Sequence, residues 1–540
     1  MPKLFIISKF HARGREINYV YLSYVIRLSL IKILKIDIKC AAMFIYVHPL
    51  LLHFVLNYVK IIFMKKVGLI TLGCPKNQVD SEVMLGRLKE AGFTLTPDEY
   101  EAEIAIVNTC GFINDAKEES IERIIEAGRL KEKGRCEILI VTGCLSERYK
   151  EDLIKELPEV DAFIGVSEMS GIVELCMELI NNKVGAIHEL PLQNDNTPKN
   201  NDPSRILINP SHYAYVKIAD GCNNACSYCA IPAIKGAVKS SEIETIINEA
   251  EYLVSKGVKE INLIAQDITD YGIDIYQKRR LADLLRSLVK IKDLSWIRLL
   301  YTYPDHFDDE LIDIIASEGK ICKYLDIPIQ HIDDSILKAM RRKSSEKGVI
   351  SLLEKLRDNI PDIVLRTSLI VGFPGETEAQ FRRLYDFVKE IEFNRLGVFT
   401  YSKEEGTSAS LYKNQIPQKI KEQRRDKIMR LQSGISLKKN RKLIGKTLNV
   451  LIDGPHPILP LQGGGKGGGV FLIEGRYYGQ APEVDGVVYI NDVVADLRVC
   501  PPNTGEHIGS PLLKAGQFAN VRITEAHQYD LVGRAVQEGA

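Results

Sequence analysis

The sequence predicts an α/β protein with three folded parts: an N-terminal open parallel α/β sheet domain, a central partial (β/α)6 barrel and a C-terminal small all-β barrel. Strand and helix patterns alternate through residues 64–190 and again through 208–408, which is typical of parallel sheets covered by helices. Short strands separated by turn residues fill 443–540, which favours a small barrel. A chain of 540 residues with 45% hydrophobic residues is long enough for three such domains.

Residues 1–63 differ from the rest of the chain. They are rich in Ile, Leu, Tyr and basic residues, and the uncharged run Cys40–Val59 is about as long as a membrane span needs. Pro49 and several polar residues interrupt this run, and a convincing first strand begins only after Met64. We interpret 1–63 as an upstream extension that is not part of the native fold, with a membrane anchor as the alternative.

Charge and cysteine content indicate the class of protein. The formal net charge is zero, so the whole chain offers no electrostatic case for binding nucleic acid or an anionic membrane. Eleven cysteines in 540 residues are too few for a disulfide scaffold, and several have the spacing of metal ligands. We therefore expect a cytoplasmic protein in a reducing compartment, without stable membrane association.

Three cysteines of the first α/β domain follow the ends of predicted strands. Val67–Gly73 runs into Cys74, Ile104–Thr109 into Cys110, and Ile138–Gly143 into Cys144. Because the carboxyl ends of parallel strands share one edge of a sheet, these cysteines should converge. The alternative is three buried structural cysteines, and we assign Cys136 and Cys176, which lack this placement, to that role.

A second set, Cys222-x3-Cys226-x2-Cys229, follows the predicted strand Tyr213–Ile218. Three thiolates this close can hold one iron–sulfur cluster and leave one iron open to a small molecule. A zinc knuckle and a disulfide-bearing loop are the alternatives. Zinc normally takes four ligands, and no fourth Cys or His follows nearby.

The barrel itself is predicted from six strands, and active-site groups are expected at their C-terminal ends. A polar linker, 191–207, precedes the barrel region. The predicted strands are Tyr213–Ile218, Glu260–Gln266, Trp296–Tyr303, Tyr324–Ile329, Val364–Val371 and Leu396–Tyr401. The groups at their ends include Gln266-Asp267, Tyr303-Pro304, Gln330-His331 and the glycine-rich turn Gly372–Glu376.

The C-terminal region begins with 409–442, a densely basic segment of helical period that we interpret as a solvated connecting helix. Five short strands follow in 443–540, interrupted by two loop insertions at about 455–470 and 495–514. From Arg441 onward there are nine Lys and Arg residues against ten Asp and Glu residues. An RNA-binding module should carry a positive excess, so a basic protein partner fits this charge at least as well.

The cysteine motif after the first barrel strand resembles that of the radical S-adenosylmethionine (SAM) superfamily. With the second cysteine set and the terminal barrel, residues 64–540 are similar to the methylthiotransferases of that superfamily. The resemblance implies two 4Fe–4S clusters and a TRAM-like last domain. It places an auxiliary cluster on Cys74, Cys110 and Cys144, and the SAM cluster on Cys222, Cys226 and Cys229. No catalytic residue beyond these ligands is assigned.

The same resemblance implies a SAM pocket and a substrate. The pocket is assigned to Tyr228, Gln266, Asp267, Ser368, Gly372 and Phe373. Stretches such as Cys74-Pro75-Lys76-Asn77 and Gly479–Asp485 are similar to the branch that modifies an aspartate β-carbon of ribosomal small-subunit protein twelve (RimO-like). The alternative is the branch that modifies adenosine in tRNA (MiaB-like). The implied partners are an external electron donor, a sulfur donor and the ribosome.

Two segments depart from the family pattern. The family commonly reads Ile-Arg-Gly-Pro and then Arg-Ser-Arg after the cluster motif, whereas this chain has Ile234–Ala237 with Lys235 and then Lys239-Ser240-Ser241. Lys keeps the positive charge of Arg without its bidentate fork. Lys343 stands where the family usually has Gly. A non-catalytic iron–sulfur binding protein is therefore a third hypothesis.

Overall fold

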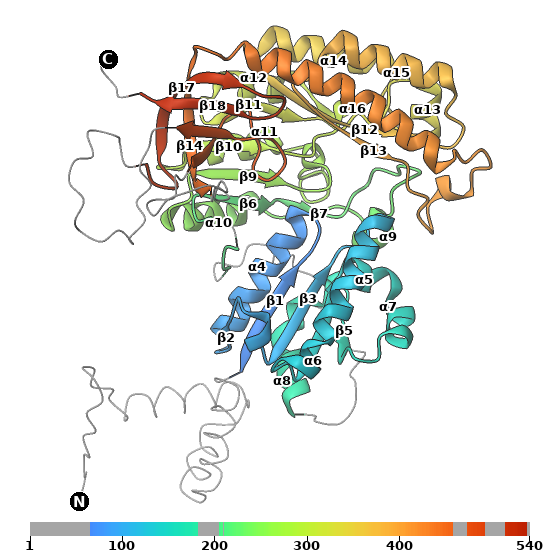
Figure 1. The fold of residues 1–540 in the computed structure, drawn as a ribbon, viewed down its shortest axis with the longest axis vertical. Coiled ribbons are helices and arrows are strands. Elements are labelled where there is room, and N and C mark those ends of the chain that lie inside the picture. The colour runs from blue at the N-terminus through green and yellow to red at the C-terminus, as the bar shows by residue number, and fades with distance from the viewer. Residues whose placement is uncertain (1–64, 182–204, 209, 457–471, 492–512, 537–540) are drawn as a thin grey trace, which may run out of the picture. The chain divides into compact units, whose positions relative to one another are not determined.

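The computed structural model describes residues 65–181, 205–208, 210–456, 472–491 and 513–536 (Figure 1). The predicted extension 1–63 lies outside the described residues, as do most of the predicted linker and most of both loop insertions. Within the described residues, no helix combines the length and apolar character that a membrane span requires.

The first domain is a five-stranded sheet in the order β2-β1-β3-β4-β5, with every pairing parallel. Its strands are β1 Lys66–Thr71, β2 Thr94–Leu95, β3 Ile104–Thr109, β4 Ile138–Gly143 and β5 Ala162–Phe163. Its helices are α4 Pro75–Glu90, α5 Asn114–Gly128, α6 Leu130–Lys133, α7 Cys144–Glu156 and α8 Ile172–Asn181. All residues of β3 and β4 are buried, because helices cover both faces of a parallel sheet. The predicted open parallel sheet is confirmed.

The central domain is a six-stranded parallel sheet in the order β13-β12-β11-β10-β9-β6. Its strands are β6 Tyr213–Lys217, β9 Glu260–Ile264, β10 Trp296–Leu299, β11 Ile321–Asp326, β12 Val364–Val371 and β13 Arg395–Thr400. Its helices are α9 Ile231–Lys235, α10 Ile243–Ser255, α11 Leu281–Leu288, α12 Asp309–Ser317, α13 Asp334–Ala339, α14 Glu346–Asn359 and α15 Glu378–Ile391. Apolar side chains of strands and helices form one large core, as the predicted partial barrel requires.

Two sequence-based details of this domain were wrong. The fourth strand begins at Ile321 and ends at Asp326, three residues earlier than predicted at each end. Strand β10 ends at Leu299, so Tyr301 and Tyr303 lie beyond it. The backbone of Tyr301 is left-handed, with φ +64°, which cannot continue a strand.

The basic helix α16, Gln418–Arg441, is not simply solvated. It contacts β13 and α15, and it buries a stripe of residues that includes Ile428, Gln432 and Ile435. Gln432 donates to the carbonyl of Phe393 at 2.9 Å. The helical period was therefore predicted correctly and the solvated environment was not, because polar and basic residues occupy part of its buried face.

The last domain is a closed five-stranded barrel in the order β14-β15-β16-β18-β17. Its strands are β14 Thr447–His456, β15 Leu472–Tyr477, β16 Val488–Asn491, β17 Phe518–Ala526 and β18 Leu531–Ala535. This confirms the predicted small barrel. Its turn after β15 contacts the inner face of the central sheet: Tyr213 donates to Glu483 at 2.8 Å, and Tyr324 donates to Asp485 at 2.7 Å.

Candidate active site

The register of the first sheet brings the first cysteine set together. Thr71 pairs with Asn108 and Thr109 pairs with Gly143, so β1, β3 and β4 end side by side. Cys110 and Cys144 directly follow the last two strands, and Cys74 caps helix α4. The three predicted ligands therefore lie at one edge of the sheet.

Two glycines allow this close approach. Gly73 has φ +90°, and a Cβ there would lie 2.7 Å from the Cβ of Cys110. Gly143 has φ +102°, and a Cβ there would lie 2.7 Å from the backbone nitrogen of Thr109. Any larger residue would clash and would also strain the left-handed backbone. The glycines that precede Cys74 and Cys144 thus have a steric role.

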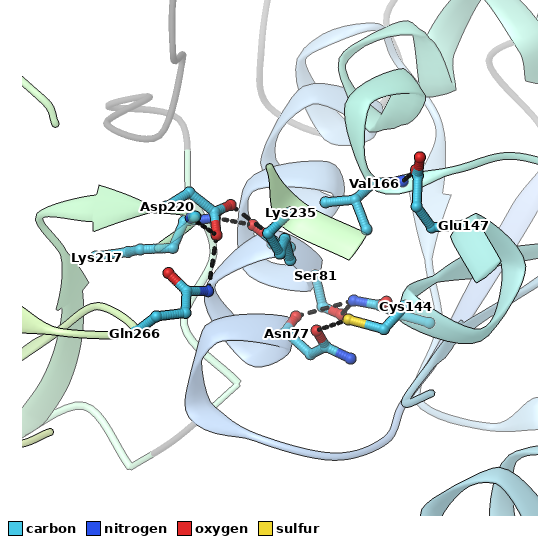
Figure 2. A network of polar contacts seen from close by, with 12 residues as sticks. Asn77, Ser81, Cys144, Glu147, Val166, Lys217, Asp220, Lys235 and Gln266 are labelled. Carbon is cyan, nitrogen blue, oxygen red and sulfur yellow. Dashed lines mark hydrogen bonds and ion pairs between the residues drawn. The ribbon is translucent and has the colours of Figure 1, made fainter. Parts of the chain in front are cut away.

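Two asparagines fix the strand ends, and sequence reasoning assigned them no role. The Asn77 amide donates to the carbonyls of Leu72 at 3.1 Å and Thr109 at 2.9 Å. The Asn108 amide donates to the carbonyl of Asn77 and to Ser81 Oγ, each at 2.9 Å. Cys144 Sγ lies 3.7 Å from Asn77 Oδ1 (Figure 2). The sequence signal that could have identified these two asparagines is their position beside the cysteines, in Cys-Pro-Lys-Asn and Asn-Thr-Cys.

The second cysteine set lies in a loop held by its own backbone. The N–H of Cys222 donates to the carbonyl of Gly236 at 3.1 Å, and that of Cys229 donates to Cys226 at 3.2 Å. The N–H of Asn224 donates to Cys222 Sγ at 3.4 Å. Amide donors to sulfur are typical of iron–sulfur sites, where they stabilise thiolate charge.

Burial keeps four of these cysteines in the thiol form in the absence of a metal. It raises the pKa of Cys144 and of Cys229 to about 12 and the pKa of Cys222 to about 11, and it also raises the pKa of Cys110. A bound metal deprotonates a coordinating thiol outright. Two sets of three converging thiols, each set within mutual electrostatic range, therefore fit two clusters with three protein ligands each.

A cavity of about 810 Å³ lies beside Cys74 of the first set and beside the loop that carries the second set. Its wall includes Cys74 from the first domain and Tyr228, which lies between Cys226 and Cys229. The wall also includes Tyr301 of the central domain and Val484 of the last domain. The cavity is therefore lined by one cysteine of the first set and by one residue of the loop that carries the second set.

Comparisons with known proteins agree with this arrangement. Three family models match: Uncharacterized protein family UPF0004 over residues 66–165, the Radical SAM superfamily over 216–388 and the TRAM domain over 444–536. The ribosomal protein uS12 methylthiotransferase RimO of Acetivibrio thermocellus is 48% identical over 88% of this chain and 99% of its own length. Those of Thermoanaerobacter sp. and Syntrophotalea carbinolica are 47% and 46% identical, over 87% and 88% of this chain and 100% and 97% of their own lengths.

The chain belongs to the ribosomal protein uS12 methylthiotransferase family. The predicted resemblance to radical SAM methylthiotransferases is thereby confirmed. The near-complete coverage of the relatives means that both cysteine-bearing domains and the TRAM barrel are shared with them.

A buried ionic network joins the first two domains of this family member. Asp80, on helix α4, forms ion pairs with Lys217 of β6 and with Lys235 of α9, the latter at 3.3 Å. The same two lysines pair with Asp220 at 3.1 and 3.3 Å (Figure 2). Both lysine side chains are at most 3% exposed. Lys235 stands where the family pattern usually has Arg, and its ammonium still pairs with the carboxylates of Asp80 and Asp220.

A second interdomain contact lies at Glu404, after β13. This carboxylate pairs with Lys117 at 2.9 Å and with Arg148 at 3.1 Å, both from the first domain. Arg148 also donates to the carbonyl of Gly111 at 2.7 Å, beside Cys110. Sequence reasoning missed both ionic contacts, because charged side chains carry no local signal of a partner far along the chain.

The residues predicted for the SAM pocket are distributed over three environments. Tyr228 and Ser368 line the cavity. Asp267 accepts from Asn224 of the cysteine loop at 2.8 Å and lies 3.2 Å from His306, while Gln266 donates to Asp220 at 2.9 Å.

The glycine-rich turn forms the third environment. Gly372 has φ +71°, and Phe373 is fully buried with its ring 5.4 Å from that of Tyr401. The Phe373 N–H donates to Glu376 at 3.1 Å. Burial raises the pKa of Glu376 to about 7 even though Arg424 lies nearby. The SAM pocket as a whole stays a prediction.

Proposed function

We propose that this chain transfers a methylthio group to the β-carbon of an aspartate in ribosomal protein uS12. The observation that carries the proposal is a cavity lined by Cys74 of the first cysteine set and by Tyr228 of the loop that carries the second. The names of the relatives favour uS12 over the tRNA alternative. An aliphatic C–H bond has no useful acidity, so general-base catalysis by a side chain could not activate the β-carbon.

The proposed cofactors are two 4Fe–4S clusters, on Cys74, Cys110 and Cys144 and on Cys222, Cys226 and Cys229, together with SAM. When bound, they supply the radical chemistry that breaks a C–H bond and forms a C–S bond. The chain contributes geometry: the Asp80 network holds helix α4 and the α9 region together, and these elements adjoin one cysteine set each. An electron donor, a sulfur donor and contact with the ribosome remain part of the proposal.

The charge of the last domain supports a protein target less strongly than its composition suggested. Asp453, Glu483 and Asp485 point to the central domain: Asp453 lies 2.7 Å from His212, and the other two accept from tyrosine hydroxyls. These three acids are used in a domain contact and are not available to a basic partner. The choice of uS12 therefore depends on family membership more than on charge.

Mass spectrometry of a strain that lacks this gene tests the proposal. The aspartate of uS12 should lose the 46 Da that replacing hydrogen with a methylthio group adds, roughly the mass of CH2S. Complementation with the chain should restore the mark, as should Cys136→Ala, because Cys136 is a buried cysteine outside both sets. Cys110→Ala should not. Loss of a tRNA methylthio mark with uS12 unchanged would contradict the proposal.

A further inference from the structure

Lys76 is a buried cation beside the auxiliary cysteine set. It follows Cys74 by two residues on helix α4 and is 8% exposed. Its Nζ lies 3.3 Å from the centroid of the Tyr301 ring, and both Tyr301 and Cys74 line the cavity. In the part of the chain that the structure describes, no carboxylate oxygen comes within ion-pair distance of this ammonium, and no acceptor hydrogen-bonds to it.

The neighbouring buried cations all have partners. Around the same cavity and domain boundary, the pairs are Lys217 and Lys235 with Asp80 and Asp220, Arg366 with Asp326, and Lys117 and Arg148 with Glu404. Lys403, at the cavity wall, is exposed, so water can solvate it. Lys76 differs from all of these because it is both buried and unpaired among the described residues.

The Tyr301 ring cannot balance the Lys76 charge by itself. A cation on a tyrosine face recovers only part of the solvation that burial removes. The ring is also held in place: Tyr301 has φ +64°, its N–H donates to Asp326 at 3.2 Å, and its carbonyl accepts from Ile268 at 3.1 Å. A non-glycine residue held in this conformation at a cavity wall indicates a preformed site.

We propose that Lys76 binds the carboxylate of the target aspartate. This inference rests on the proposed function. The carboxylate carbon is bonded directly to the β-carbon, so a β-carbon brought to the Cys74 side of the cavity brings a carboxylate to the same place. Lys76 supplies a cation beside Cys74 and Tyr301. Asp220 and Asp326 are within electrostatic range of it but do not pair with it directly, so binding would give both charges a direct partner at a largely buried site. Lys76 is thus a specificity-determining residue that selects aspartate over neutral side chains.

The test compares uS12 carrying the target Asp with uS12 carrying Asn at that position. Full-length wild-type enzyme should modify Asp at least about 30-fold faster than Asn, as expected for a buried charge-assisted contact. Lys76→Met and Lys76→Gln should reduce this ratio to near one, mainly by lowering the rate on Asp. Lys89→Met, an exposed position on the same helix, should keep the wild-type ratio.

Two further measurements separate a failure of the proposed Lys76 role from a failure of the proposed function. Iron content and release of 5′-deoxyadenosine from SAM should be unchanged in both Lys76 variants, which shows that they fold and hold their cofactors. Retention of the full preference for Asp in either variant, or equal wild-type rates on Asp and Asn, would overturn the role of Lys76. A wild-type enzyme that modifies neither form of uS12 would instead overturn the proposed function.

Discussion

Neutralising Asp80 should loosen the contact between the first two domains. Asp80 accepts ion pairs from Lys217 and Lys235, whose side chains are 1% and 3% exposed, and Asp220 is the other carboxylate in the network. In Asp80→Asn, two buried lysines share one carboxylate. An amide can still accept one hydrogen bond, but one positive charge is left without compensation.

The magnitude follows from the geometry. At 3.3 Å, the Asp80–Lys235 attraction is about 5 kcal/mol with an effective dielectric constant of about 20. Desolvation offsets part of this energy, and removing one partner of a buried pair typically costs about 3–5 kcal/mol. The matched control is Asp309→Asn. Asp309 pairs with Lys355, but the two side chains are 81% and 46% exposed, so the expected loss is about 0–1 kcal/mol.

Two measurements test the effect of Asp80→Asn: urea unfolding, and the amount of 5′-deoxyadenosine released for each methylthio product formed. Asp80→Asn should lower the midpoint of the first unfolding transition, whereas Asp309→Asn should leave it nearly unchanged. Because the network joins elements that adjoin different cysteine sets, Asp80→Asn should also raise the ratio of 5′-deoxyadenosine released to methylthio product formed. Equal midpoints for the two variants, with an unchanged ratio, would refute the assigned role of Asp80.

Three other predictions follow from the same structure. Burial lowers the pKa of His331 to about 4 from its ordinary value of 6.5, so the stability gained by keeping it neutral is lost as pH falls from 6.5 to 4. The loss should reach about 3 kcal/mol, and urea midpoints across that range should depend less on pH in His331→Gln; an unchanged slope would contradict this. Trp296, the chain's one tryptophan, lies 4.9 Å from Phe518 of the TRAM barrel. Arg476→Met removes the pair with Glu260 of the central domain at 2.6 Å and the pair with Asp453 at 2.9 Å. Loosening this domain contact should expose Trp296 to water and shift its emission to the red, while Arg522→Met, at an exposed position, should leave the emission unchanged. Reconstituted Cys110→Ala should lose about four irons per chain yet still cleave SAM; unchanged iron content would count against the auxiliary cluster.

The sequence was sufficient to predict the fold class and to single out six candidate cluster ligands, because both depend on local patterns. Apolar runs buried between helices appear as such in the sequence, and β3 and β4 have their predicted bounds. Cysteines that follow parallel strands must reach one sheet edge, and the register of Thr109 with Gly143 brings them there. Strand ends were less predictable. The left-handed backbone of Tyr301 ends the extended segment, and the apolar pattern of the sequence gives no indication of it.

Only the tertiary structure decided which charges are paired. Asp80 is 137 residues from Lys217 and 155 from Lys235, and the fold alone makes them neighbours. Composition alone leaves the last domain's acids available to a partner, but in the folded chain Glu483 and Asp485 accept from Tyr213 and Tyr324. The isolation of Lys76 is likewise a property of the folded chain. Composition counts charges, whereas burial and distance determine which of them remain free to bind a substrate.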